Sequence, residues 1–198
     1  YARFLKGTAA YYGVPVRTGI DVLGLTREDE RWRVDTTAGA IRARHVVWAA
    51  GEFQYPSDRP FPGAEFCRHN ASVASWGSID GDQVVVIGGY ESGLDAAIHL
   101  ARAGRRVIVL DRRTPPPWSD DSSDPSLSLS PYTRERLAIP EIRKRITLVE
   151  GADIFDVRRD GERFVVEAVS GERYESSSSP ILATGFRGST VLVAGHFE

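Results

Sequence analysis

The chain has 198 residues, of which 41% are hydrophobic and 10% aromatic, so it can bury a core and is not a disordered segment. Its net charge of -2 gives no electrostatic reason to expect nucleic acid or an anionic membrane as a partner. A single cysteine excludes an internal disulfide framework and a cysteine-rich zinc site, and no apolar run approaches the roughly 18 residues of a membrane-spanning helix.

The first part of the chain is predicted to form a helix followed by an antiparallel meander. Residues 1–12 have helical character and end at Gly13, a residue type that often terminates helices. Short alternating runs separated by turn-rich stretches follow, around 14–17, 22–25, 31–36 and 40–42. The apolar run 45–51 is then expected to be buried. Residues 52–79, which contain three prolines, are expected to be a connection.

The middle of the chain is predicted to form a strand, a glycine-rich turn, a helix and a second strand. These segments lie at 83–87, 88–93, 94–102 and 106–110. Parallel strands joined by a helix make a right-handed crossover, so we expect a Rossmann-like βαβ unit in a parallel sheet. The segments that follow are predicted as a long loop, a helix and a strand, at 114–131, 132–137 and 146–149.

The meander pattern occurs twice in the sequence. Seven residues have counterparts 132 positions further along, pairing Gly19 with Gly151, Asp21 with Asp153, Glu30 with Glu162, Arg31 with Arg163, Trp32 with Phe164, Val34 with Val166 and Gly39 with Gly171. The run 49–51 then matches 183–185, with two residues inserted within 172–180. We interpret this pattern as an internal duplication, the alternative being two unrelated meanders with similar turns. The predicted fold class is α/β, with a Rossmann-like βαβ parallel sheet and a duplicated antiparallel three-stranded meander.

The glycine-rich turn is the strongest candidate for a ligand site. A helix N-terminus offers unpaired N–H groups and the positive end of its dipole to a pyrophosphate. Gly88 and Gly93 fill the first and third positions of a dinucleotide-binding turn, which allow the tight turn and the close packing of helix on strand. The middle position holds Tyr90, which is expected to crowd the pyrophosphate, while Gly89 is expected to supply room. The alternative is a structural turn whose glycines serve packing alone.

The predicted cofactor contacts extend along this turn and to the end of the second strand. In the turn they are Gly88, Gly89, Tyr90, Glu91, Ser92 and Gly93. Asp111 stands where an acid accepts hydrogen bonds from an adenosine ribose. Arg112 and Arg113 follow it, and guanidinium groups bind phosphate strongly. We expect NADPH to be preferred over NADH because two arginines outweigh one carboxylate, the alternative for the arginines being a solvated turn.

Other reactive side chains carry weaker signals. Cys67 has no partner cysteine in the chain. The four histidines, which are interpreted as surface, linker or packing residues without metal-ligand spacing, are His45, His69, His99 and His196. The sequence therefore predicts no metal site, and it identifies no catalytic residue.

Further short strings make the pattern more specific. Residues 92–97 read S-G-L-D-A-A, residues 183–185 read A-T-G, and Phe66 and Trp76 frame a linker in which Arg68 and Ser72 lie between them. Together with the glycine turn, these strings resemble flavoproteins with two dinucleotide-binding domains, nearest the flavin-containing monooxygenases and related class B flavoprotein monooxygenases. That group has an S-G-x-D-x-A string in its NADPH turn, an A-T-G strand end and an F-x-G-x-x-x-H-x-x-x-W linker.

The resemblance implies an FAD domain that is split by an NAD(P)H-binding domain. Residues 1–52 correspond to part of the FAD domain, 53–79 to a linker, 80–185 to the NAD(P)H-binding domain and 186–198 to the return toward the FAD domain. It also implies cofactor contacts at Ala183, Thr184 and Gly185. The implied activity is that of a flavin-dependent oxidoreductase, monooxygenase-like, that passes hydride from NADPH to FAD.

Two other functions stay open at this point. The chain could be a portion of a flavin-dependent disulfide reductase, or a non-enzymatic nucleotide-binding module. The sequence contains no Met, starts within an apparent helix and has no secretory signal, so we expect a piece of a longer cytoplasmic protein. Its expected partners are NAD(P)H and the missing FAD-domain segments of the same protein, with no nucleic acid and no membrane.

Overall fold

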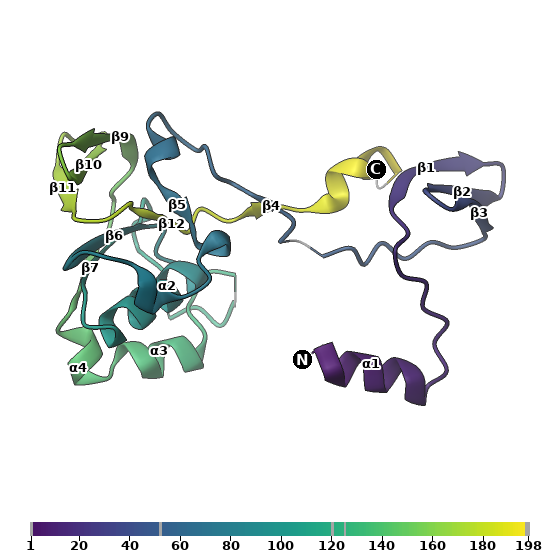
Figure 1. The fold of residues 1–198 in the computed structure, drawn as a ribbon, viewed down its shortest axis with the longest axis horizontal. Coiled ribbons are helices and arrows are strands. Elements are labelled where there is room, and N and C mark those ends of the chain that lie inside the picture. Colours follow the sequence, from purple (N-terminus) through teal and green to yellow (C-terminus); the bar gives the residue numbers. More distant parts are fainter. Residues whose placement is uncertain (1, 52, 120, 125, 197–198) are drawn as a thin grey trace. The chain divides into compact units, whose positions relative to one another are not determined.

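The structure is a computed structural model that describes residues 2–51, 53–119, 121–124 and 126–196. The chain divides into two compact units, Tyr1–Glu52 with Gly188–Glu198, and Phe53–Arg187. We call them unit 1 and unit 2 and describe each by itself (Figure 1). Among the described residues, no helix combines the length and the apolar character needed to cross a membrane.

Unit 2 is built on a five-stranded parallel sheet. In spatial order its strands are β5 (Arg68–His69), β12 (Ile181–Leu182), β6 (Gln83–Ile87), β7 (Arg106–Leu110) and β8 (Ile146–Val149). Between β6 and β7 the chain forms α2 (Glu91–Arg102), and between β7 and β8 it forms α3 (Pro131–Leu137) and α4 (Pro140–Arg143). This arrangement confirms the predicted α/β fold with a βαβ unit.

The two faces of the parallel sheet are covered by different layers. Val84 and Val86 of β6 pack with Leu94 of α2, whereas the intervening Val85 packs with Val157 on the antiparallel sheet of unit 2. Figure 1 shows the helices on one side of the parallel sheet and the antiparallel strands on the other. Because both faces are buried, the sequence of β6 is a continuous apolar run and does not alternate.

Each unit contains a three-stranded antiparallel sheet. In unit 1 its strands are β1 (Val22–Glu28), β2 (Arg31–Thr36) and β3 (Gly39–Ala43); in unit 2 they are β9 (Ile154–Asp160), β10 (Arg163–Ala168) and β11 (Arg173–Ser176). A shift of 132 positions brings β1 and β2 onto β9 and β10 residue for residue. The β1–β2 pair and the β9–β10 pair also have the same register, including a bulge that falls between Val22 and Gly24 in one pair and between Ile154 and Asp156 in the other.

The side chains at the tips of the two meanders repeat as well. The guanidinium of Arg27 lies 5.0 Å from the ring centre of Trp32, and that of Arg159 lies 6.0 Å from the ring centre of Phe164. Equivalent strand bounds, an equivalent bulge and equivalent ring contacts are not expected of unrelated meanders. The structure therefore confirms the predicted duplication.

One predicted buried segment is exposed. Residues 45–51 form no strand, and Val47 is 88% exposed. The expectation that this run is buried was wrong for this structure. An apolar run is buried only where another strand or helix covers it, and none of the described strands pairs with 45–51. The alternating run 14–17 likewise forms no strand, although the preceding helix α1 (Ala2–Tyr11) is present as predicted.

Two segments of unit 2 are more ordered than the sequence indicated. Helix α2 begins at Glu91, before the predicted start at 94, so the last part of the glycine turn is its first helical turn.

The predicted connection 53–79 contributes β5 to the parallel sheet. It also contains β4 (Tyr55–Pro56), which forms a separate two-stranded sheet with β13 (Phe186–Arg187). It also forms three short 3-10 helices, Ala64–Phe66, Asn70–Ser72 and Trp76–Ser78. Strands of two residues are too short to give a periodic signal.

Unit 1 is completed by the C-terminal segment. It contains two short 3-10 helices, Ser189–Leu192 and Ala194–His196. His196 Nε2 lies 2.7 Å from the backbone oxygen of Leu25, and its ring contacts Trp32 edge to face. In this way His196 packs onto the meander of unit 1.

Candidate nucleotide-binding site

The glycine turn lies at the carboxyl ends of the central parallel strands. β6 lies between β12 and β7, and the chain leaves β6 toward β7 through α2, while β12 is added on the opposite side. In open parallel sheets, ligands bind in the crevice at such a reversal of strand order. The sheet topology therefore places the turn after Ile87 at the point where this fold binds ligands.

Two glycines of the turn are required by close backbone contacts. Gly88 has φ +104, and a Cβ there would lie 2.4 Å from the backbone oxygen of Ala183. A Cβ on Gly93 would lie 1.8 Å from the backbone oxygen of Gly88. Real Cβ atoms do not approach backbone this closely, so side chains at either position would force the turn, the first turn of α2 and the end of β12 apart. The roles predicted for the first and third glycines agree with this geometry.

The open side of Gly89 is occupied by protein. A Cβ on Gly89 would lie 2.3 Å from Cζ3 of Trp118 and 2.9 Å from Cβ of Asp111. The indole of Trp118, 29 residues away in sequence, and the side chain of Asp111 therefore fill the space that a side chain at position 89 would need. Trp118 was not singled out from the sequence, where it lies in the irregular stretch 114–131.

Asp111 connects the turn to the end of β7. Its Oδ2 accepts a hydrogen bond from the backbone N–H of Gly89 at 2.8 Å. Its Oδ1 accepts from the backbone N–H and from Nε of Arg113, both at 2.9 Å, and Oδ2 also accepts from Arg113 Nη2 at 3.0 Å. The Asp111 residue is only 4% exposed. The carboxylate that was expected to accept from a ribose is thus engaged by four protein N–H groups.

These contacts determine the charge of the carboxyl group. Burial alone would raise the pKa of Asp111, but the hydrogen bonds from Arg113 and Gly89, with the charge of Arg113, hold the pKa below its usual value. The same ion pair raises the pKa of Arg113. Asp111 is therefore an ionised carboxylate, paired with a cation, at neutral pH.

Arg113 lies between Asp111 and the ring of Tyr90. Its guanidinium carbon is 5.4 Å from the ring centre of Tyr90, within the range of a cation–π contact. The Arg113 side chain remains 41% exposed, and Arg112 is exposed. Tyr90, at the middle position of the turn, also packs against the core beneath α2. Two cationic groups are therefore presented at the end of β7, one of them held in a defined orientation.

The side chain of Glu91 is directed to the neighbouring helix. Its carboxylate accepts hydrogen bonds from the backbone N–H and the hydroxyl of Ser130, and from Oγ1 of Thr133 at 2.6 Å. Ser130 is the N-cap of α3, so Glu91 joins the N-termini of α2 and α3.

Ser92 is exposed on the first turn of α2. A cavity of about 620 Å³ lies beside Tyr90 and Glu91 and extends to Arg134.

The other predicted contacts lie at the end of β12, against the segment that precedes β6. Thr184 Oγ1 donates to the backbone oxygen of Ser57 at 2.6 Å. The backbone oxygen of Gly185 lies 3.0 Å from Nε2 of His69. Because Nδ1 of His69 accepts from the backbone N–H of Ala71, Nε2 carries the proton and donates to Gly185. His69, which the sequence indicates only as a surface, linker or packing residue, thus contacts the A-T-G strand end, and no sequence pattern signals this contact.

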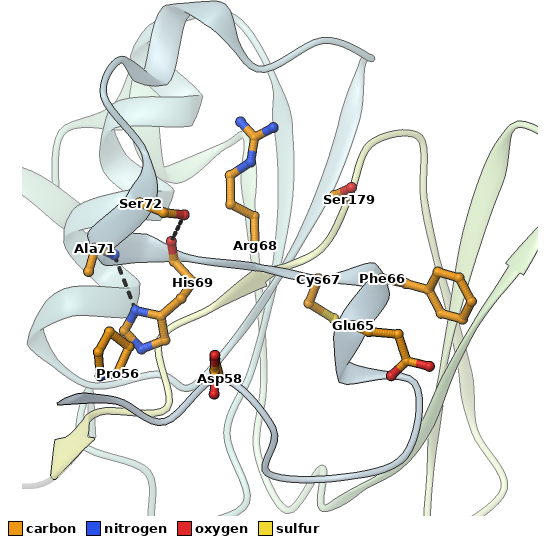
Figure 2. Close-up of a pocket in the computed structure, with 10 residues that line it drawn as sticks. All are labelled: Pro56, Asp58, Glu65, Phe66, Cys67, Arg68, His69, Ala71, Ser72 and Ser179. Carbon is orange, nitrogen blue, oxygen red and sulfur yellow. Dashed lines mark hydrogen bonds between the residues drawn. The ribbon is translucent and has the colours of Figure 1, made fainter.

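A second cavity, of about 510 Å³, adjoins β5 (Figure 2). Figure 2 shows the imidazole of His69 on the opposite side of this strand from the guanidinium of Arg68. Burial, and to a lesser extent the charge of Glu65, raises the pKa of the Cys67 thiol to about 12. Cys67 is therefore a protonated thiol at neutral pH.

Within the described part of the chain, no group of three or more His, Cys, Asp or Glu side chains could hold a metal ion.

Comparison with known families gives a match over the whole chain. The sequence pattern of the pyridine nucleotide-disulphide oxidoreductase family matches residues 1–198. An uncharacterised CzcO-like oxidoreductase of Geobacillus kaustophilus is 29% identical over 104 residues, which are 50% of this chain and 30% of that protein.

Similar solved structures show the same fold. Bacillithiol disulfide reductase from Bacillus cereus superposes with a TM-score of 0.74 at 23% identity, covering 98% of this chain and 58% of that one. Thioredoxin reductase from T. acidophilum gives 0.68 at 17% identity, with 96% and 60% covered. Tmm from Pelagibacter sp. strain HTCC7211 gives 0.58 at 15% identity, with 84% and 34% covered. The chain thus spans from about a third to 60% of the length of these proteins.

Proposed function

Because the chain belongs to the pyridine nucleotide-disulphide oxidoreductase family, we propose that unit 2 binds NADPH at the turn from Gly88 to Gly93 and positions it to reduce an FAD in the complete protein. The supporting observation is the close approach of Gly88, Gly93 and Ala183 at the start of α2, in the crevice of the parallel sheet. This geometry brings a helix N-terminus within reach of a pyrophosphate.

The chain's own residues supply binding and orientation in this proposal. The nicotinamide, when bound, supplies the hydride, and the flavin accepts it. In this arrangement the first turn of α2 would hold the pyrophosphate, with the A-T-G strand end beside Gly88. Arg112 and Arg113 would meet the adenosine end. Because the Asp111 carboxylate is occupied by protein N–H groups, the charge presented to a ligand there is positive. This favours the 2′-phosphate of NADPH.

The same proposal assigns the two units. Unit 1 corresponds to segments of an FAD domain, and residues 80–185 within unit 2 to the NADPH-binding domain, with 53–79 leading into it and 186–198 returning toward FAD. The exposed run 45–51 is then a strand whose sheet partners belong to other FAD-domain segments of the complete protein. This would explain why an apolar sequence lies on the surface of unit 1.

We further propose a monooxygenase-like reaction in the complete protein, supported by the string 92–97. A disulfide reductase is the second candidate. It is disfavoured for this part of the protein because Cys67 is the chain's single cysteine and its raised pKa keeps the thiol protonated. A non-enzymatic nucleotide-binding module would bind NADPH without transferring hydride to a flavin.

The test has two stages. In the first, calorimetric titration of the 198-residue chain should show NADPH binding. Replacing both Arg112 and Arg113 by Ala should lower the affinity for NADPH far more than the affinity for NADH. If the double variant binds both cofactors as the parent does, the assignment of the adenosine end is wrong.

The second stage uses the complete protein. Anaerobic mixing with NADPH should bleach the flavin absorbance at about one NADPH per flavin. Subsequent oxidation by oxygen with substrate supports the monooxygenase, and oxidation by a disulfide supports the reductase. Binding without bleaching would leave only the non-enzymatic module.

A further inference from the structure

The carboxylate of Asp111 is positioned between the glycine turn and Arg113. We propose that Asp111 is a positioning residue that sets cofactor preference through Arg113 and does not itself contact the ribose. This inference rests on the proposed NADPH site. It states which residue distinguishes the adenosine end of NADPH from that of NADH, and through which contacts. The position of Asp111 at the end of β7 does not by itself decide this.

The hydrogen-bond capacity of the carboxylate supports this role. An ionised carboxylate has about four acceptor positions. Four N–H groups already point at it: one from Gly89 at 2.8 Å and three from Arg113 at 2.9–3.0 Å. Asp111 is 4% exposed, and its side chain lies against Gly89. A ribose hydroxyl would have to displace one of these charge-assisted bonds to reach it.

Asp111 instead determines how Arg113 is presented. Nε and Nη2 of Arg113 form a two-point pair with the carboxylate, and the guanidinium lies over the ring of Tyr90 at 5.4 Å. Nη1 takes no part in the pair with Asp111, and the side chain is 41% exposed. A guanidinium held on two sides loses little conformational freedom when a phosphate binds it. The orientation, and not the charge alone, is therefore what Asp111 contributes.

The same carboxylate ties this orientation to the phosphate-binding turn. The backbone of Gly89 is fixed by Asp111 Oδ2, and Trp118 occupies the space next to the Gly89 Cα. Arg113, Asp111 and Gly89 thus form one hydrogen-bonded chain from the adenosine end to the turn. Displacing Asp111 should change the discrimination between NADPH and NADH more than it changes binding of the part that the two cofactors share.

A double-mutant cycle tests this route. The dissociation constants of NADPH and NADH are measured by calorimetry for the parent, Asp111→Asn, Arg113→Ala and the double variant. Asp111→Asn should raise the dissociation constant of NADPH about tenfold and that of NADH much less, since the loss of a charge-assisted hydrogen bond weakens binding by about that factor. In the Arg113→Ala background, Asp111→Asn should no longer change the ratio of the two constants.

Direct ribose contact gives a different result. If Asp111→Asn weakens NADH equally in the parent and in the Arg113→Ala background, Asp111 acts on the cofactor itself and the inference is wrong. The matched control is Asp82→Asn, which breaks an exposed pair of 2.7 Å with Arg106 at the other end of the strands and should leave both constants unchanged.

A second variant covers the case in which Asp111→Asn does not fold. Arg113→Lys keeps the charge on a half-exposed side chain but cannot form the two-point pair. It should lose most of the preference for NADPH, as Arg113→Ala does. If Arg113→Lys keeps the parent ratio, charge alone is sufficient and positioning by Asp111 is ruled out. Failure of the parent to bind either cofactor would instead overturn the proposed function.

Discussion

The backbone N–H of Gly89 donates a 2.8 Å hydrogen bond to Oδ2 of Asp111. This bond joins the glycine turn after β6 to the carboxyl end of β7, two segments that adjoin at the same edge of the parallel sheet. The turn that would bind a pyrophosphate and the residues that would meet the adenosine end therefore form a single hydrogen-bonded structure.

The ion pair of Asp111 should make the stability of unit 2 depend on pH. The pKa of Asp111 is lowered in the folded state, so its contribution to stability is fully present above its unfolded pKa of about 3.8 and is lost as the pH falls through the folded value. Asp111→Asn should therefore lower the free energy of unfolding by about 1.5–3 kcal/mol near neutral pH. Urea unfolding should show this difference narrowing below about pH 4. A difference that is constant down to about pH 2 would contradict the ionised pair.

Gly93→Ala should disrupt the turn. Its Cβ would lie 1.8 Å from the backbone oxygen of Gly88, so helix α2 must move away from the turn. We expect a loss of about 1–3 kcal/mol of unfolding free energy and loss of NADPH binding in calorimetry. The matched control is Gly77→Ala, whose Cβ would find its nearest neighbour, Ser75 Oγ, at 3.8 Å. Equal NADPH affinity in the two variants would show that this turn does not bind the cofactor.

Tyr90 should support NADPH binding through its ring. The ring lies 5.4 Å from the Arg113 guanidinium, and such contacts contribute about 0.5–1 kcal/mol at exposed sites. Tyr90→Phe should keep the NADPH affinity, whereas Tyr90→Ala should lower it by about two- to fivefold. If Tyr90→Ala binds NADPH more tightly, the ring crowds the pyrophosphate, as the sequence alone suggested.

Cys67 should react slowly with thiol reagents. Burial raises its pKa to about 12, and the thiolate is the reactive form. Ellman's reagent at about pH 8 should modify the folded chain far more slowly than the urea-unfolded chain, whose thiol has a pKa near 8.5. Comparable rates in the two states would mean that Cys67 is accessible and ionised, which would strengthen the disulfide reductase alternative.

The 198-residue chain should purify without flavin. The described residues of unit 1 include no parallel strand followed by a glycine turn and a helix, which is the arrangement that holds an FAD pyrophosphate. The absorbance between 350 and 500 nm should therefore be negligible after purification. A yellow preparation with about one FAD per chain would contradict the assignment of unit 1 as part of a divided FAD domain.

Much of the fold was determined by local patterns in the sequence. The runs 83–87, 106–110 and 146–149 became strands with those bounds, because short and mainly apolar runs are typical of strands in a parallel sheet. The duplication was detectable because glycines and alternating residues recur at a fixed separation. The run 45–51 was misjudged because an apolar pattern shows that a segment can be buried but does not identify what covers it.

The sequence by itself also located the candidate site, since Gly88 and Gly93 stand at a strand–helix junction and Asp111 at the end of the next strand. Only the tertiary structure decided how these residues are used. It placed Trp118 against Gly89, turned Asp111 to Arg113 and linked His69 to Gly185. The reason is physical: a sequence shows how many hydrogen bonds a side chain can form, but its partners are set by which segments the fold brings within about 3 Å.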